Sequence, residues 1–460
     1  MNYLLSLFIS SLLGFLGLNI LRSQDRIDPV LHIIASIGLG SALSAQIIFY
    51  TLFIIGHYNP AAVWIGHGIV FVILVAANFS IFKKDPASMF PKFPPDQITW
   101  IGFGILSLIL LPLWREAHFY PFGGWDAWAC WNLKAKFIFL GGDHWKNMLD
   151  TSMWRSNNQY PFLLPLMNTW GWSFYHNPSV SVPLSNAVLF TFLTASMMFW
   201  GLKRSLKNIL SVIPPLILFT IPFINTLSIS QYSDIILAFY LLGSFVCLIC
   251  AREEQSVPLA IISGLLCGAM SFTKTEGSLA CLLIVGLSIP YLLKRPNKSR
   301  PLLVGFLTAA VLSAMPTILF QLFWATQNVS FTNGLTSADH PATFVRLKVI
   351  FMFLLAELTS LKWNGLWFLL AGGLFLGWKK CFKNGLTIIP MFLSIYLTAA
   401  IAHYFINTHY EIVWWLGTTL NRILYTILPL IVWWVFVAAW SQPDKAPRAK
   451  PVVPDSQIFN

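Results

Sequence analysis

Long apolar runs separated by short polar segments constrain this chain more than any other feature of its sequence. Thirteen stretches are apolar and long enough to cross a bilayer as helices. They cover about residues 2–21, 30–55, 61–82, 98–113, 183–202, 209–225, 235–251, 258–272, 278–293, 301–324, 364–378, 386–402 and 425–441. A β-barrel would show short alternating segments instead. We therefore expect an all-α polytopic membrane protein with about 13 transmembrane helices.

Composition and charge agree with this class. Of the 460 residues, 57% are hydrophobic and only 10% are charged, whereas soluble domains carry about 25% charged residues. The net charge of +12 is explained by the excess of Lys and Arg in cytoplasmic loops of membrane proteins, so it indicates no nucleic-acid partner. The six cysteines show neither zinc spacing nor a disulfide framework.

Basic clusters predict the orientation. They are Lys83, Lys84 and Lys92; Lys203, Arg204 and Lys207; Lys294, Arg295, Lys298 and Arg300; Lys379, Lys380 and Lys383; and Lys445, Arg448 and Lys450. All five clusters fall in the cytoplasm if the N-terminus is outside and the C-terminus inside. This topology requires the run 344–360 to be an interfacial helix on the outer leaflet rather than a span.

Three regions follow from the pattern of runs. Residues 1–97 form an N-terminal module of three helices and a cytoplasmic loop, and residues 98–441 form the main transmembrane module. The latter includes a long outer loop, 114–182, in which we expect short amphipathic helices on the outer leaflet because tryptophan favours the membrane interface. Its tryptophans are Trp125, Trp128, Trp131, Trp145, Trp154, Trp170 and Trp172. The polar tail 442–460 is expected to be disordered.

The most polar part of this loop reads GGWDAWACWNLKAK, residues 123–136. A helix over 125–140 would place Asp126, Cys130 and Lys134 on one face and turn Lys136 away. The two glycines before Trp125 permit a tight turn. Alternatively, Asp126 caps the helix and the lysines contact lipid head groups.

Three other outer stretches carry charge at the ends of apolar runs, where charge is costly and often functional. Asp234 in QYSDIILAFY begins a helix, and a simple N-cap is the alternative. Lys274 and Glu276 interrupt the apolar sequence in SFTKTEG, and a turn with an ion pair is the alternative. Arg422 lies at the start of the last run, and a snorkelling arginine is the alternative.

Taken together, the four stretches supply two acids and several cations on one side of the membrane. Cations stabilise a departing phosphate, and a carboxylate can accept the proton of an attacking hydroxyl. The combination therefore favours transfer of a group from a phosphate leaving group to a nucleophile. A lipid-linked donor would reach such a site sideways from the bilayer.

Over about residues 115–430 the chain resembles the GT-C glycosyltransferases, and more closely a bacterial group related to the lipid A aminoarabinose and protein O-mannosyl transferases. The stretches that carry the resemblance are GWDAWACWNLKAK, NNQYPFLLPL, QYSDIILAF, TKTEG and the tryptophan-rich segment before Arg422. Many members have a histidine-proline pair just before a YPLLLPL-like run. The matching stretch here is Asn157-Asn158-Gln159-Tyr160-Pro161, which has no histidine. The first three spans lie outside the pattern.

The resemblance implies that Asp126 is the general base and that Asp234 is a second outer acid, which orients the acceptor or helps to bind a metal. It implies Lys134 or Lys136 as a ligand of the lipid phosphate. Lys274 and Arg422 are assigned to the phosphate by charge alone. The remaining site candidates are Trp125, Asn132, Tyr160 and Glu276. Some members need a divalent metal, but the chain has no DxD-type acid pair, so we expect no metal or other cofactor.

The expected function is an inverting glycosyltransferase of the bacterial inner membrane, with its active site facing the periplasm. It would move a sugar from a polyprenyl-phosphate donor to a glycan, lipid or protein acceptor of the envelope. The alternatives are a flippase of lipid-linked glycans, a polymerase or ligase of such glycans, and a non-enzymatic partner in envelope assembly.

Overall fold

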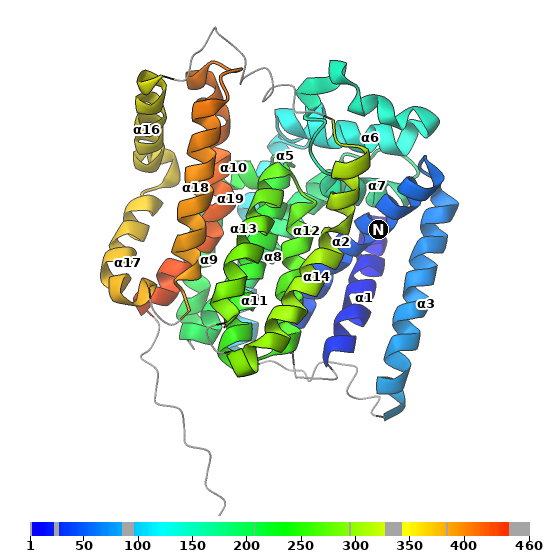
Figure 1. Cartoon of the computed structure of the whole chain (residues 1–460), viewed down its shortest axis with the longest axis horizontal. Coiled ribbons are helices and arrows are strands. Elements are labelled where there is room, and N and C mark those ends of the chain that lie inside the picture. Colours follow the sequence, from blue (N-terminus) through cyan, green and yellow to red (C-terminus); the bar gives the residue numbers. More distant parts are fainter. Residues whose placement is uncertain are drawn as a thin grey trace, which may run out of the picture.

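A computed structural model of the chain describes residues 2–22, 27–84, 96–206, 208–293, 296–326, 343–382 and 385–440. Every regular element in these ranges is a helix, and most of the helices run side by side as a bundle (Figure 1). The all-α class expected from the sequence is therefore correct. The expected tail 442–460 lies outside the described residues, as do several basic loop residues: Lys92, Lys207, Lys294, Arg295 and Lys383.

Ten helices in the described ranges are long and apolar enough to cross a membrane, which is the architecture of a multi-pass membrane protein. They are α1 (Asn2–Arg22), α2 (Pro29–Ile55), α3 (Pro60–Lys84), the continuous pair α4 (Gln97–Leu106) and α5 (Leu110–Phe119), α8 (Ser181–Leu206), α11 (Ser233–Glu254), α13 (Thr275–Leu293), α14 (Pro296–Phe323), α18 (Ile388–Ile406) and α19 (Ile412–Trp440).

The other three expected spans are built differently. The stretch 209–225 corresponds to α9 (Ile213–Thr220) and α10 (Pro222–Ile229), which are bent by 73° at one break. Pro222 begins the second helix, because proline suits a first helical turn and cannot continue the preceding one. The stretch 258–272 forms α12 (Val257–Ser271) with 15 residues, and 364–378 forms α17 (Leu366–Cys381) with 16 residues.

The segment expected to lie on the outer leaflet is α16 (Phe344–Thr359). It packs along α18 and α19 and stands above α17 (Figure 1). A short break joins the two helices, where Asn364 and Gly365 adopt left-handed backbone conformations. The sequence did not reveal this arrangement, because the pattern of apolar residues does not distinguish a helix that lies across a bundle from one that runs along it.

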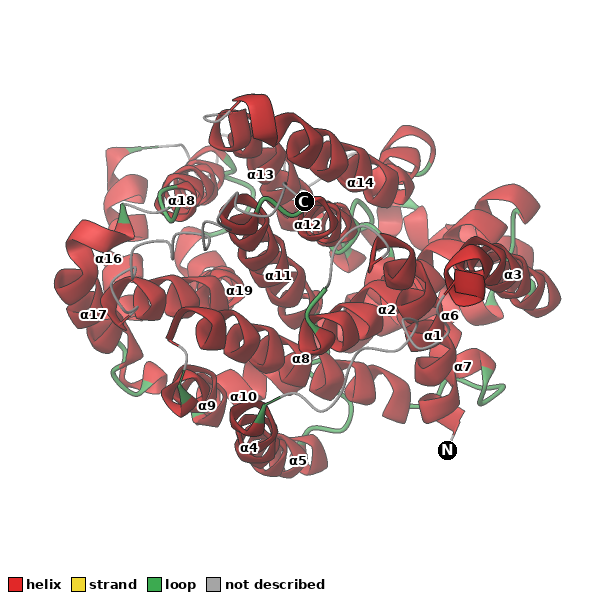
Figure 2. Cartoon of the chain, turned by 90° about the horizontal axis from the view of Figure 1, so that it is seen from below, coloured by secondary structure: helices red, strands yellow, loops and turns green. Residues whose placement is uncertain are grey.

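The interior of the bundle is formed around α11, whose entire apolar window is buried. Figure 2 shows α11 between α12 and α13 on one side and α8 and α19 on the other. This position explains why α11 is apolar on all faces. The N-terminal helices also belong to this packing, since α1 lies along α2 and α2 contacts α7, α8 and α12.

The segment 114–182 gathers at one end of the bundle, which we call the site end (Figure 1). It forms α6 (Asn132–Leu140), two 3-10 helices (Gly142–Leu149 and Thr151–Ser156) and α7 (Leu163–Ser173). Every residue of α7 is buried, which differs from the expected amphipathic helices on a leaflet.

The tryptophans of this segment also differ from the expectation. Trp131, Trp145, Trp170 and Trp172 are buried, whereas Trp114, Trp125 and Trp128 are exposed. Three of the buried indoles donate hydrogen bonds: Trp145 Nε1 to Gly56 O at 2.6 Å, Trp170 Nε1 to Ser10 Oγ at 3.0 Å and Trp172 Nε1 to Ser179 O at 2.8 Å. These three tryptophans can be buried without leaving the indole N–H unpaired, because protein oxygen atoms accept its hydrogen bond in place of water.

Candidate functional site

The two glycines of the GGWDAW stretch fit the loop that carries Asp126 against the residues before α11. Gly124 N donates a hydrogen bond to Ser230 O at 3.0 Å. Gly123 has a φ of +71°, and a Cβ atom there would lie 2.6 Å from Ser230 O. A Cβ atom on Gly124 would collide with the hydroxyl of Tyr232. The loop can approach α11 this closely only because both residues lack side chains.

Asp234 and Lys274 form the buried floor of the site. Asp234 lies in the first turn of α11, and Lys274 lies in the turn between α12 and α13. Lys274 Nζ contacts Asp234 Oδ1 at 2.7 Å, and their side chains are 4% and 2% exposed. Burial lowers the pKa of Lys274, but the carboxylates of Asp234 and Glu276 raise it, and the net pKa is above its ordinary value. Lys274 therefore remains a cation.

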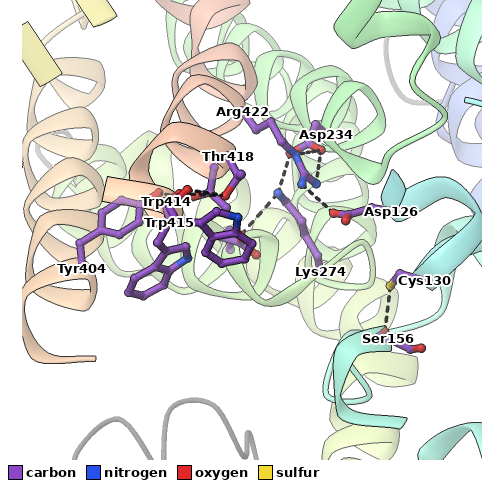
Figure 3. Close-up of polar contacts among 12 residues, drawn as sticks. Asp126, Cys130, Ser156, Asp234, Lys274, Tyr404, Trp414, Trp415, Thr418 and Arg422 are labelled. Atoms are coloured by element: carbon purple, nitrogen blue, oxygen red, sulfur yellow. Dashed lines mark hydrogen bonds and ion pairs between the residues drawn. The ribbon is translucent and has the colours of Figure 1, made fainter. Parts of the chain in front are cut away.

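Arg422 joins the two aspartates that the sequence singled out. Its Nη1 contacts Asp126 Oδ2 at 2.6 Å, while its Nη2 and Nε contact Asp234 Oδ2 at 2.9 Å and 3.2 Å. Figure 3 shows the guanidinium between the two carboxylates, with Lys274 on the other oxygen of Asp234. Arg422 is not at the start of the last helix as expected, since α19 begins ten residues earlier at Ile412.

The aromatic ring of Tyr232 supports the guanidinium from one face. The guanidinium carbon Cζ of Arg422 lies 4.3 Å from the ring centroid of Tyr232, within the range of a cation–π contact. Tyr232 immediately precedes α11, so one short segment supplies both the aromatic support and the buried acid. Sequence reasoning missed Tyr232, although its place in QYSD two residues before Asp234 was a usable signal.

The charged groups of the site differ in how far solvent or a ligand can reach them. The side chains of Asp126, Arg422 and Glu276 are 24%, 16% and 31% exposed, whereas Asp234 and Lys274 are almost fully buried. Glu276 Oε1 lies 3.4 Å from Lys274 Nζ. A ligand can thus reach Asp126, Arg422 and Glu276 directly, while the other two groups hold the arrangement from below.

The geometry excludes most of the simpler explanations of these charges. Neither Asp126 nor Asp234 uses its carboxylate as a helix cap, because both bind cations. Arg422 does not snorkel as an isolated cation, because it binds both acids. The turn with an ion pair is correct for Lys274 and Glu276, but Lys274 also binds Asp234 at a shorter distance.

The structure does not bring Lys134 to this cluster. Its side chain is fully buried, and Nζ donates hydrogen bonds to Asn157 O at 2.6 Å and Tyr160 O at 3.4 Å. The ring centroids of Trp131, Tyr160 and Phe162 lie 5.8, 5.7 and 5.9 Å from Nζ. Burial lowers the pKa of Lys134. Lys136 is exposed and turned away from Lys134, as the helical spacing predicts.

The local backbone explains why Asp126, Cys130 and Lys134 do not point at one ligand. Residues Ala127–Trp131 form a π-helical turn before α6, and its wider i→i+5 pattern changes the register expected for an α-helix. Cys130 Sγ instead donates to Ser156 O at 2.9 Å (Figure 3), and burial raises the pKa of its thiol to about 11.

Asn132 belongs to a buried chain of side-chain hydrogen bonds that ends beside the site. Asn132 Nδ2 donates to Gln231 Oε1 at 3.1 Å, and Gln231 Nε2 donates to Pro121 O at 2.8 Å. In the other direction, Asn168 donates to Asn132 and Asn186 donates to Asn168, both at 2.9 Å. This chain, which we call the amide chain, connects α8 and α7 to the segments that carry Asp126 and Asp234.

The remaining candidates line the surroundings of the cluster. Tyr160 stacks on Trp131 with ring centroids 5.5 Å apart, and Trp125 is exposed next to Asp126 in the sequence. Figure 3 shows Tyr404 and Trp415 near the charged cluster, with ring centroids 4.7 Å apart. Neither Tyr404 nor Trp415 was among the site candidates expected from the sequence.

Within the described part of the chain, no group of three or more His, Cys, Asp or Glu side chains is placed to hold a metal ion. Comparisons with protein-family models, with curated proteins and with solved structures find no match for this chain.

Proposed function

We propose that this chain is an integral-membrane glycosyltransferase that moves a sugar from a polyprenyl-phosphate donor to a glycan, lipid or protein acceptor of the bacterial envelope. The observation that carries the proposal is the bridge of Arg422 between Asp126 and Asp234, with Lys274 behind it. Four separate segments of an apolar bundle bring these charges together, at a cost that membrane proteins bear where the charges have a function.

Donor binding in this proposal exchanges one partner of Arg422. A phosphate offers the guanidinium a bidentate partner, and Asp126 is the partner that gives way because its side chain is far more exposed than that of Asp234. The two contacts from Arg422 to Asp234 and the ring of Tyr232 keep the guanidinium in place. The released carboxylate of Asp126 then becomes available as a base.

The reaction is a single displacement. The acceptor hydroxyl oxygen forms a bond to the anomeric carbon, and its proton passes to the carboxylate of Asp126. The bond from the anomeric carbon to the phosphate oxygen breaks, and its electron pair stays on the phosphate. Arg422 and Lys274 stabilise the charge that develops there, and the anomeric configuration inverts.

Asp234 has a positioning role in this scheme rather than direct contact with the acceptor. It is 2% exposed and binds both cations, so it fixes their spacing before the donor arrives. Preorganised charges of this kind cost little reorganisation at the moment of reaction. Glu276, half-buried beside Lys274, is the group that we assign to a hydroxyl of the substrate.

The proposed location is the bacterial inner membrane, with the site end facing the periplasm. Basic residues of the described part gather at the ends of helices that run away from the site: Lys203, Arg204, Arg252, Lys379 and Lys380. Positive charge favours the cytoplasmic side, which supports this orientation. The bilayer is the partner that the ten apolar helices require.

A flippase of lipid-linked glycans is the second candidate. The observation that favours it is the 73° bend between α9 and α10, since broken helices are common in transporters. Asp234 lies in the first turn of α11, Lys274 in the turn before α13 and Asp126 just before the π-helical turn, while Arg422 lies within α19. Three of the four charges thus lie at helix ends, which favours the transferase.

The test uses purified protein in nanodiscs with a panel of radiolabelled polyprenyl-phosphate sugars, and it measures label released to water or transferred to an acceptor. We expect the wild type to turn over one donor and Asp126→Asn to lose at least about 10²-fold of that rate. Lys203→Gln is the matched control, because it removes an ion pair with Asp96 away from the site and is expected to keep the rate.

Equal turnover by the wild type and Asp126→Asn would contradict the proposed base. Transbilayer movement of a lipid-linked sugar, without release of label from any donor of the panel, would favour the flippase.

A further inference from the structure

The exposed large hydrophobic side chains along α4, α5 and the following loop are aromatic at both ends and aliphatic between them, with Trp100 as the aromatic residue near the start of α4. Within α4 and α5 the exposed large side chains from residue 101 to residue 111 are aliphatic: Ile101, Leu108, Leu110 and Leu111. From residue 114 to residue 128 the exposed large hydrophobic side chains are all aromatic: Trp114, Phe119, Tyr120, Phe122, Trp125 and Trp128. We call these six aromatic residues the aromatic rim.

The aromatic rim lies on the outside of the molecule. Figure 2 shows α4 and α5 at the periphery of the bundle, and only 28% of the apolar window of this span is buried. The exposed fractions of Trp114, Phe122 and Trp125 are 74%, 65% and 62%. Trp125 and Trp128 contact each other edge to face, with ring centroids 4.3 Å apart, so together they form one surface.

We propose that the aromatic rim lies in the head-group layer of the bilayer and sets the depth of the ionic site in the membrane. Exposed aliphatic side chains on a spanning helix match the hydrocarbon core, and Trp and Tyr concentrate where hydrocarbon meets water. The change from one to the other after Leu111 therefore marks the boundary of the hydrocarbon on this side of the protein. The occupant of this surface is lipid.

This placement has a consequence for the substrate. Asp126 lies between Trp125 and Trp128 in the sequence, and its carboxylate turns inward to Arg422. If the two tryptophans lie among the lipid head groups, Asp126 and Arg422 lie at the depth of lipid phosphates. An amphiphile with a phosphate can then reach Arg422 from the bilayer without first entering water. The inference depends on exposure and helix placement, not on the transferase reaction.

The test measures the depth of single spin labels in nanodiscs by their collision rates with oxygen, which concentrates in hydrocarbon, and with a water-soluble nickel chelate. All six native cysteines are buried, so a new exposed cysteine takes the label. Trp125→Cys and Trp128→Cys report on the rim. Leu111→Cys is the hydrocarbon reference, and Lys136→Cys, exposed on the next helix, is the aqueous reference.

We expect the ratio of oxygen to nickel collisions at positions 125 and 128 to lie between the high value at position 111 and the low value at position 136. A ratio at position 125 as low as that at position 136 would place the rim in water and overturn the inference. Low collision rates with both reagents, together with a short label-to-label distance between two copies, would show a protein partner on this surface and would also overturn it.

Discussion

Gly124 has no room for a side chain, because a Cβ atom there would collide with the hydroxyl of Tyr232. The ring of Tyr232 in turn lies under the guanidinium of Arg422. A change of one methyl group at Gly124 therefore reaches the centre of the ionic cluster through a single neighbour. This answers why two glycines precede Trp125 and Asp126 in the sequence.

We predict that Gly124→Ala lowers turnover by about 10²-fold, since displacement of a catalytic group by about 1 Å can have an effect of this size. The measurement is the turnover of the donor that the wild type uses, together with the midpoint of thermal unfolding. Gly286→Ala is the control, because a Cβ atom there meets nothing within 4 Å. Equal turnover by the two variants would contradict the tight approach at Gly124.

Single residues of the site could be predicted from the sequence where a charged residue interrupts an apolar run. Asp126, Asp234, Lys274 and Arg422 each interrupt an apolar context, and the structure brings all four together. Lys134 satisfied the same criterion but binds backbone carbonyls in a buried position. Sequence alone could not separate these cases, because the partner of a buried lysine depends on where a distant loop folds.

The amide chain is a property of several elements rather than of one residue. Tyr3 of α1 extends it at one end, because its hydroxyl donates to Asn186 Oδ1 at 2.8 Å, and at the other end Gln231, before α11, donates to Pro121 O. The members between them lie on α8, α7 and α6. The first helix of the chain is thus connected to the site by continuous hydrogen bonds, although the sequence pattern placed it in a separate module.

We predict that Asn168→Leu lowers the free energy of unfolding, because it leaves polar atoms of Asn186 and Asn132 buried without partners, at roughly 1–3 kcal/mol for each. The reaction of the buried native cysteines with a fluorescent maleimide during heating measures the unfolding midpoint. Thr194→Val is the control, since Thr194 bonds only to Phe190 O of its own helix. Similar midpoints for both variants would show that the amide chain adds nothing to stability.

The position at which a helix begins was harder to predict from the sequence than its existence. The run 425–441 was expected to be the last span, but α19 begins at Ile412. Polar residues of this first part, such as Thr419 and Arg422, hid the helix from a hydropathy argument, although they face the partners Tyr404, Asp126 and Asp234. A polar stretch that is paired within the protein looks like a loop when the pairs are unknown.

At the scale of the whole molecule, the all-helical class and the multi-pass character followed directly from apolar run lengths. The number of long helices did not, because α9 and α10 are bent at Pro222 and α12 has only 15 residues. Packing inside a bundle relaxes the length requirement that an isolated span must meet. The position of α16 along α18 and α19 likewise depends on contacts that no local pattern contains.

Orientation is also a whole-molecule property. We predict that Lys136→Cys reacts with a membrane-impermeant maleimide in intact cells, whereas Lys379→Cys reacts only after permeabilisation. The reason is that Lys136 lies at the site end and Lys379 in the last turn of α17, in a basic cluster that favours the cytoplasm. The reverse pattern of labelling would place the site in the cytoplasm.

The central claim is that Asp126 and Arg422 act as one unit in transfer from a phosphate donor. A double-mutant cycle on turnover, with Asp126→Asn, Arg422→Gln and the double variant, tests it most directly. Residues that act together have strongly non-additive effects. The account predicts that the double variant is no slower than the slower single variant. Losses that multiply, or full turnover by either single variant, would contradict it.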